Sequence, residues 1–165
     1  MTKREAVFTK DPENKKLTII RVFEAPLESV WNAWTQSEIL DQWWAPKPYL
    51  AETKTIDFRE GGHWLYLMKG PDNSGHDSWC IENIKTIQPL YKITNDVSFC
   101  DEEGNINHDF PTMHWKKEFN QQGEETVVKV EITFDMVEDL ETIVKMGFQQ
   151  GFIAGLDNLD EYLSA

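Results

Sequence analysis

Apolar residues recur at intervals of four and three through the last part of the chain, from Glu138 to Ala165. This spacing places them on one face of a helix, whereas a strand would alternate in steps of two. Acidic residues crowd the start of the stretch, where the positive end of a helix dipole stabilises them. We therefore predict a long C-terminal helix, which needs a broad apolar surface to lie on. Its apolar face comprises Leu140, Val144, Phe148, Phe152, Leu156, Leu159 and Leu163.

A second row in the same stretch consists of Gly147, Gly151 and Gly155. Each glycine costs about 1 kcal/mol relative to alanine inside a helix. Three glycines at a spacing of four indicate that something must come very close to this face. They mark either tight packing against the sheet or space left for a ligand, and we favour packing.

Upstream of this stretch, from Tyr49 onward, the period of the apolar residues is two, which is typical of strands. The clearest alternation places Val128, Val130 and Ile132 on one face and Lys129 and Glu131 on the other. Segments rich in glycine, proline, asparagine and aspartate separate the strands. We predict strands at residues 51–59, 63–69, 78–87, 91–100, 113–120 and 126–136.

The first half of the chain begins differently. Residues 17–24 are rich in β-branched and aromatic side chains and predict one further strand. Pro26 then stands near the start of a short helix over residues 27–35. A second short helix begins at Ser37, buries Trp43 and Trp44, and ends before Pro46.

The predicted order is thus one strand, two short helices, six strands and one long helix. Strands joined by short turns form an antiparallel meander. A curved sheet of about seven strands wrapped around the terminal helix buries both apolar surfaces at once. We therefore predict an α+β fold with one domain over residues 17–165, preceded by a polar lead-in over residues 1–16.

The charge of the chain limits its partners. A formal net charge of −13 and a pI near 4.6 argue against nucleic acids and anionic membrane surfaces, because both repel a negative field. The chain has no apolar run long enough for a membrane span, and its N-terminus lacks the apolar core of a signal peptide. Cys80 and Cys100 have neither CxxC nor zinc-ligand spacing. We expect a reduced, cytoplasmic protein.

Several ordered motifs resemble bacterial proteins related to the C-terminal domain of the activator of Hsp90 ATPase. They are RVFEAP at 21–26, AWT at 33–35, QWW at 42–44, FREGGHW at 58–64 and MKGPD at 68–72. The glycine–phenylalanine pairs of the last helix match the same family, so the similarity spans about residues 15–165.

This resemblance implies the helix-grip fold of the START-like superfamily, in which the sheet and the long helix enclose an elongated cavity. Members of the superfamily include lipid carriers, polyketide cyclases and aromatases, hormone receptors and the Hsp90 co-chaperone. The resemblance therefore implies a fold rather than one function.

Seven tryptophans and nine phenylalanines indicate aromatic packing or an aromatic-lined cavity. Alternation places Trp64, Tyr66 and Met68 on one face of a strand, and the family motif implies that this face looks inward. The same interpretation brings two residues of the strand at 113–120 and two of the terminal helix to the inside. The arrangement is either a ligand pocket or a filled aromatic core. The expected cavity-lining residues are Trp64, Tyr66, Met68, Glu82, Met113, Trp115, Phe148 and Phe152.

Tyr66, Glu82 and His114 are the candidate polar anchors of that pocket. A buried Glu82 beside Tyr66 could act as a general acid or base, because desolvation raises the pKa of a carboxyl group. The alternative, which we favour, is that Glu82 faces solvent, as most acidic side chains do. The histidines lack metal-ligand spacing, so we expect neither a metal ion nor a cofactor.

Cys80 and Cys100 lie on strands joined by a turn near Pro89. If the positions of paired residues sum to an even number, the two sulfurs are cross-strand neighbours. An odd sum places them on opposite faces of the sheet.

Three functions are compatible with these features. We rank first a non-catalytic binding protein whose internal cavity holds a small apolar or aromatic molecule. Second is a cyclase-like or hydrolase-like enzyme that uses Tyr66, Glu82 or His114 in the same cavity. Third is a protein-interaction module like the Hsp90 co-chaperone. We rank it last because the chain lacks room for the additional N-terminal domain of the eukaryotic activator, which argues against stimulation of the Hsp90 ATPase.

Overall fold

The computed structural model of the chain describes residues 5–72 and 74–164 and confirms the predicted α+β fold. Its strands form one antiparallel sheet in the order β1-β2-β8-β7-β6-β5-β4-β3. The strands are β1 (Val7–Asp11), β2 (Lys16–Phe23), β3 (Leu50–Asp57), β4 (His63–Lys69), β5 (Ser78–Gln88), β6 (Lys92–Cys100), β7 (Met113–Gln122) and β8 (Glu125–Thr133). The helices are α1 (Leu27–Thr35), α2 (Ser37–Trp43), α3 (Val137–Lys145) and α4 (Phe148–Ser164).

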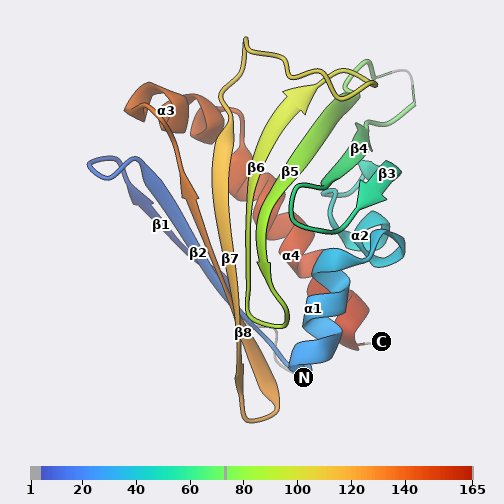
Figure 1. The fold of residues 1–165 in the computed structure, drawn as a ribbon, viewed down its shortest axis with the longest axis vertical. Coiled ribbons are helices and arrows are strands. Elements are labelled where there is room, and N and C mark those ends of the chain that lie inside the picture. The colour runs from blue at the N-terminus through green and yellow to red at the C-terminus, as the bar shows by residue number, and fades with distance from the viewer. Residues whose placement is uncertain (1–4, 73, 165) are drawn as a thin grey trace.

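The sheet curves around α4, with α1 and α2 packed towards one end of that helix and α3 at the other (Figure 1). Phe152, Leu156 and Leu159 of α4 are buried in the core between helix and sheet. Arg21 of β2 is only 2% exposed, and its Nη1 donates to Oδ1 of Asp157 at 2.9 Å. This ion pair joins the sheet to α4. None of the described helices is long and apolar enough to cross a membrane.

Strand β1 was missed by the sequence prediction and lies within the polar lead-in expected at residues 1–16. It pairs with β2 from Val7 opposite Ile20 to Asp11 opposite Lys16. Its side chains are exposed or half-buried, so an edge strand of this kind carries no alternating apolar pattern. Residues 1–4 of the lead-in lie outside the described residues.

The predicted long C-terminal helix is present as α4, but the prediction that it begins at residue 138 is wrong, because residues 137–145 form the separate helix α3. Gly147 stands between them with φ of +88°, a left-handed conformation that favours glycine and ends helices. Its backbone N–H donates to the carbonyl oxygen of Val144 at 3.1 Å. The predicted last residue of the helix, Ala165, lies outside the described residues.

The other two glycines of the row differ from each other. A Cβ at Gly155 would lie 3.0 Å from the carbonyl oxygen of Trp44 and 3.4 Å from that of Trp43. One turn away, Nδ2 of Asn158 donates to the carbonyl oxygens of Trp43 at 3.3 Å and Ala45 at 3.0 Å. Gly155 therefore lets α4 lie directly against the chain at the end of α2.

At Gly151 a Cβ would meet only Cγ of Pro46, at an ordinary contact distance of 3.8 Å. The three glycines thus have different roles. Gly147 ends a helix, Gly155 permits close packing of α4, and Gly151 leaves space beside α4.

Alanine at these last two positions should have different effects on stability. Gly151→Ala should raise the free energy of unfolding by about 0.5–1 kcal/mol, because alanine favours the helix and finds room. Gly155→Ala gains the same helix propensity but pushes α4 away from two carbonyl groups, which costs about 1–3 kcal/mol. Urea denaturation of the two variants measures the difference. Equal stability of the two variants would show that the close contact at Gly155 is unimportant.

Candidate functional site

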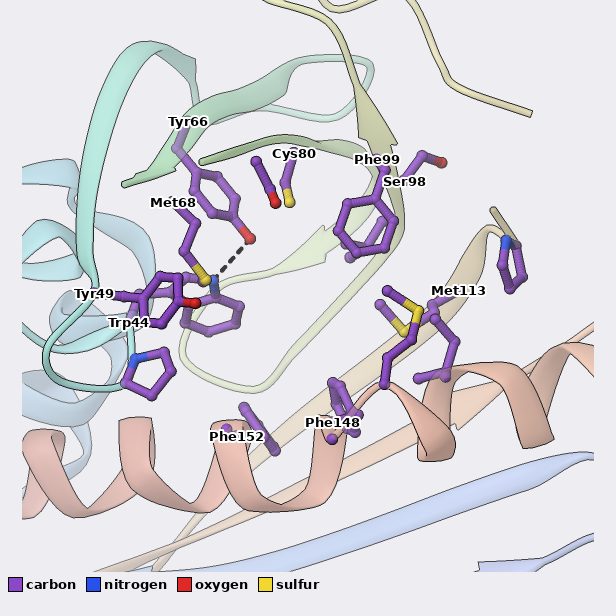
Figure 2. A pocket seen from close by; sticks show the side chains of 18 of the residues that line it. Trp44, Tyr49, Tyr66, Met68, Cys80, Ser98, Phe99, Met113, Phe148 and Phe152 are labelled. Carbon is purple, nitrogen blue, oxygen red and sulfur yellow. Dashed lines mark hydrogen bonds between the residues drawn. The ribbon is translucent and has the colours of Figure 1, made fainter. Parts of the chain in front are cut away.

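A cavity of about 340 Å³ lies between the inner face of the sheet and the helices. Figure 2 shows Tyr66 and Cys80 of the sheet on one side of it and Phe148 and Phe152 of α4 on the other. Its volume falls in the range of about 300–1,000 Å³ that is usual for ligand pockets. The interpretation as a completely filled aromatic core is therefore wrong.

Most of the predicted lining residues border this cavity. These are Tyr66, Met68, Met113, Trp115, Phe148 and Phe152. Alternation along the strands predicted the four that lie on the sheet, because inward-facing residues of neighbouring strands share one surface. Helical spacing predicted Phe148 and Phe152. The segment between α2 and β3 adds lining residues that no periodic pattern indicates, among them Pro46 and Tyr49.

Trp64 and Glu82 do not belong to the described residues that line the cavity, which corrects the prediction for both. The ring of Trp64 stacks on that of Tyr66, with centroids 4.1 Å apart and an interplanar angle of 25°. Its Nε1 donates to the hydroxyl oxygen of Thr53 at 2.9 Å. Trp64 therefore packs against the side of the Tyr66 ring that faces away from the cavity. Strand alternation places both residues on the same face of the sheet and does not show which of them borders the cavity.

The polar groups of the cavity gather on the side of β4, β5 and β6. Nε1 of Trp44 donates to the hydroxyl oxygen of Tyr66 at 2.9 Å, the bond drawn in Figure 2. Burial, with Cys80 and Glu82 close by, raises the pKa of the Tyr66 hydroxyl well above its usual range. Burial likewise raises the pKa of the Cys80 thiol to about 12. Both groups are therefore neutral at physiological pH.

Ser78 is the remaining polar side chain on this side. Ser98 also borders the cavity, but it lies opposite Ile81, so its side chain is on the other face of the sheet from Cys80. Oγ of Ser98 is hydrogen-bonded to Oγ1 of Thr112 at 2.8 Å. Among the described lining residues there is no aspartate, glutamate, lysine, arginine or histidine. The wall of the cavity is thus electrically neutral.

Glu82 is buried beneath this wall, so the interpretation that it faces solvent is wrong. It is 3% exposed, and its Oε1 accepts hydrogen bonds from Nζ of Lys117 and from Nδ2 of Asn95, both at 3.1 Å. Lys117 is also 3% exposed. Its Nζ lies 5.7, 5.8 and 5.5 Å from the ring centroids of Trp34, Trp44 and Trp115, within the range of cation–π attraction.

Trp44 and Trp115 border both the cavity and the ammonium group of Lys117. We call these two rings the aromatic floor. The aromatic floor separates a buried ion pair from a neutral cavity, and Glu82 is therefore not a polar anchor of the cavity.

His114 lies on the outer face of the sheet, away from the cavity. Its Nδ1 is hydrogen-bonded to Oδ1 of Asp96 at 2.8 Å and its Nε2 to Oδ1 of Asp135 at 3.0 Å. Burial lowers the pKa of His114, but the two carboxylates outweigh this effect and leave the pKa raised. The three predicted polar anchors thus lie in three different places: Tyr66 in the cavity, Glu82 beneath it and His114 outside.

The two cysteines do not pair. Cys80 lies opposite Phe99 and Cys100 opposite Trp79, so the positions of paired residues sum to an odd number. Cys80 and Cys100 consequently lie on opposite faces of the sheet, and both are free thiols. Cys80 is on the cavity side.

Comparison with known proteins identifies one family. The model of the family described as "Activator of Hsp90 ATPase homolog 1-like protein" matches residues 24–164. A search of curated proteins found no match.

Solved structures of bacterial proteins are similar to this one. A protein from Arthrobacter aurescens has a TM-score of 0.89 and 26% identity, over 96% of this chain and 91% of the other. A protein from Mycobacterium smegmatis has a TM-score of 0.89 and 25% identity, over 97% and 98% of the two chains. One from Staphylococcus epidermidis, at 23% identity and a TM-score of 0.82, covers 96% and 93% and shows the fold alone.

Removing Lys117 should destabilise the protein strongly. Lys117→Met leaves Glu82 as an uncompensated buried charge, which costs about 3–5 kcal/mol of unfolding free energy. The double variant Glu82→Gln/Lys117→Met removes both charges and should recover most of that loss. Lys116→Met is the control, because its partner Glu131 lies on the exposed face and such pairs contribute at most about 1 kcal/mol. Denaturant unfolding that finds the two lysine variants alike would contradict the buried pair.

The His114 cluster should make stability depend on pH. The raised pKa of His114 means that its protonation stabilises the folded state. This stabilisation is complete below the unfolded-state pKa of about 6.5 and is lost as the pH rises through the folded-state pKa. His114→Gln should therefore lower the melting temperature more at about pH 5.5 than at about pH 8.5. Asp135→Asn removes one of the two carboxylates that stabilise protonated His114. In an Asp135→Asn protein, the decrease in melting temperature caused by His114→Gln should therefore depend less on pH. A loss that is the same at both pH values would rule out this linkage.

Proposed function

The chain belongs to the family of activator of Hsp90 ATPase homolog 1-like proteins, and we propose that it binds a small neutral molecule in its internal cavity. The molecule has an apolar or aromatic body and a polar group at one edge. The observation that carries this proposal is the cavity of about 340 Å³ whose described lining holds no charged side chain.

The distribution of polar groups supports the orientation of such a ligand. Tyr66, Cys80 and Ser78 lie on the sheet side, whereas Phe148 and Phe152 lie on the helix side. A hydroxyl or carbonyl edge would face the first group, and the apolar body would contact the second. A charged ligand would lose its hydration without gaining a charged partner, which is costly in an apolar cavity.

An enzymatic function in the same cavity is the weaker proposal. It needs Tyr66, Glu82 and His114 within reach of one ligand, because general acid–base catalysis requires hydrogen-bond distances. Only Tyr66 of the three borders the cavity. Its raised pKa keeps the hydroxyl protonated, which suits it to donate a hydrogen bond to a ligand.

A panel of neutral aromatic and aliphatic compounds, each with a carboxylated analogue of similar size, tests the proposal. Native mass spectrometry and thermal shift should detect binding by neutral members, and their ionised analogues should not raise the melting temperature. Equal binding by the ionised analogues would contradict a neutral cavity.

Gly151→Leu tests whether binding occurs in this cavity. The leucine side chain would enter the cavity, since Gly151 lines it and has no close neighbour. We expect loss of ligand binding with folding preserved. Gln150→Leu places the same side chain at an exposed position of α4 and should bind ligand normally. Undiminished binding by Gly151→Leu would place the ligand elsewhere.

A further inference from the structure

A second and much smaller cavity, of about 20 Å³, adjoins the buried ion pair. Trp34, Glu82, Asn95 and Lys117 are among the residues that border it. A cavity needs roughly 10–15 Å³ to hold one water molecule. The small cavity is therefore large enough for about one water molecule.

Three of the residues that border this cavity each carry a buried polar atom that has no hydrogen-bond partner among the described residues. They are Oε2 of Glu82, Oδ1 of Asn95 and Nε1 of Trp34. The three residues are 3%, 1% and 3% exposed, so bulk water does not reach them. Buried polar groups without a partner are rare in folded proteins, because each loses its hydration without compensation.

The chemistry of the three atoms specifies what can bind them. The two oxygens accept hydrogen bonds and the indole nitrogen donates one, so the ligand must donate twice and accept once. The ammonium group of Lys117, 3.1 Å from Oε1 of Glu82, repels a metal cation. The carboxylate of Glu82 likewise repels an anion.

We propose that the small cavity is a binding site for one water molecule. The water donates to Oε2 of Glu82 and Oδ1 of Asn95 and accepts from Nε1 of Trp34. It holds the second carboxylate oxygen while Lys117 and Asn95 hold the first, and so fixes the ion pair beneath the aromatic floor. This site is independent of the ligand proposed for the larger cavity.

Trp115 provides a control within the same molecule. Its Nε1 is also buried without a partner in the described part of the chain, and its ring also lies against Lys117. It does not belong to the described residues that border the small cavity. The proposal thus concerns the indole N–H of Trp34 and not that of Trp115.

NMR of the unliganded wild-type protein tests this difference without depending on a variant. The indole proton of Trp34 should show a nuclear Overhauser effect to water, with the sign of a water that tumbles with the protein, and that of Trp115 should show no effect of that sign. Trp34→Phe and Trp115→Phe identify the two signals. Absence of the effect at Trp34, or equal effects at both indoles, overturns the proposal. Because the hydroxyl of Thr35 borders the cavity and could relay the effect, the signal must persist in Thr35→Val.

Asn95→Leu provides a second test, because it removes an acceptor and fills the site. It should abolish the effect at Trp34, whereas Asn83→Leu, on the outer face of the sheet opposite Asp96, should preserve it. Persistence in Asn95→Leu counts against the site. A high-resolution crystal structure should show one density peak within hydrogen-bond distance of all three atoms. No peak at that position overturns the proposal.

Discussion

The close contact between α4 and the chain at residues 43–45 is the constraint on which the site depends. It requires a residue without a side chain at Gly155, and the amide of Asn158 holds the carbonyl oxygens on the other side of the contact. The contact fixes Trp44, which binds Tyr66 through its Nε1 and lies against Phe152 with ring centroids 6.1 Å apart. A shift of α4 would therefore move the cavity wall and the cover of the ion pair together.

The aromatic floor allows two incompatible environments to lie side by side. A lysine ammonium group is poorly solvated in an apolar interior, but indole faces attract it electrostatically. The same rings present an apolar surface on the side of the cavity. Trp44 and Trp115 thus keep the charge of Lys117 compensated locally, and the cavity remains free of charged groups although an ion pair lies beneath it.

Periodicity in the sequence predicts which face of an element is buried, and this was sufficient for much of the fold and the cavity. Tyr66, Met113, Trp115 and Phe152 were found in this way. Periodicity does not reveal which residues of different strands meet. Glu82 is buried because Lys117, on another strand, reaches it, and only the register of β5, β6 and β7 brings them together.

The remaining errors have equally local causes. Strand β1 is an edge strand with exposed side chains, so its pairing with β2 leaves no apolar signal. The row of glycines continued the helical spacing across a position where the backbone turns left-handed. A pattern of side chains cannot report a backbone angle at a residue that has no side chain.

The break at Gly147 divides the C-terminal region into a part that packs against the chain at residues 43–45 and a part that borders the entrance of the cavity. Gly155 and Asn158 of α4 make the contact with the carbonyl groups of residues 43–45. Ile143 of α3 and Met146 border the cavity and take no part in this contact. Met146 is 49% exposed and so forms part of the rim. Substitutions at the rim can change the size of the entrance while the contact at Gly155 stays intact. The entrance of the cavity and the contact that positions α4 can therefore change independently of each other.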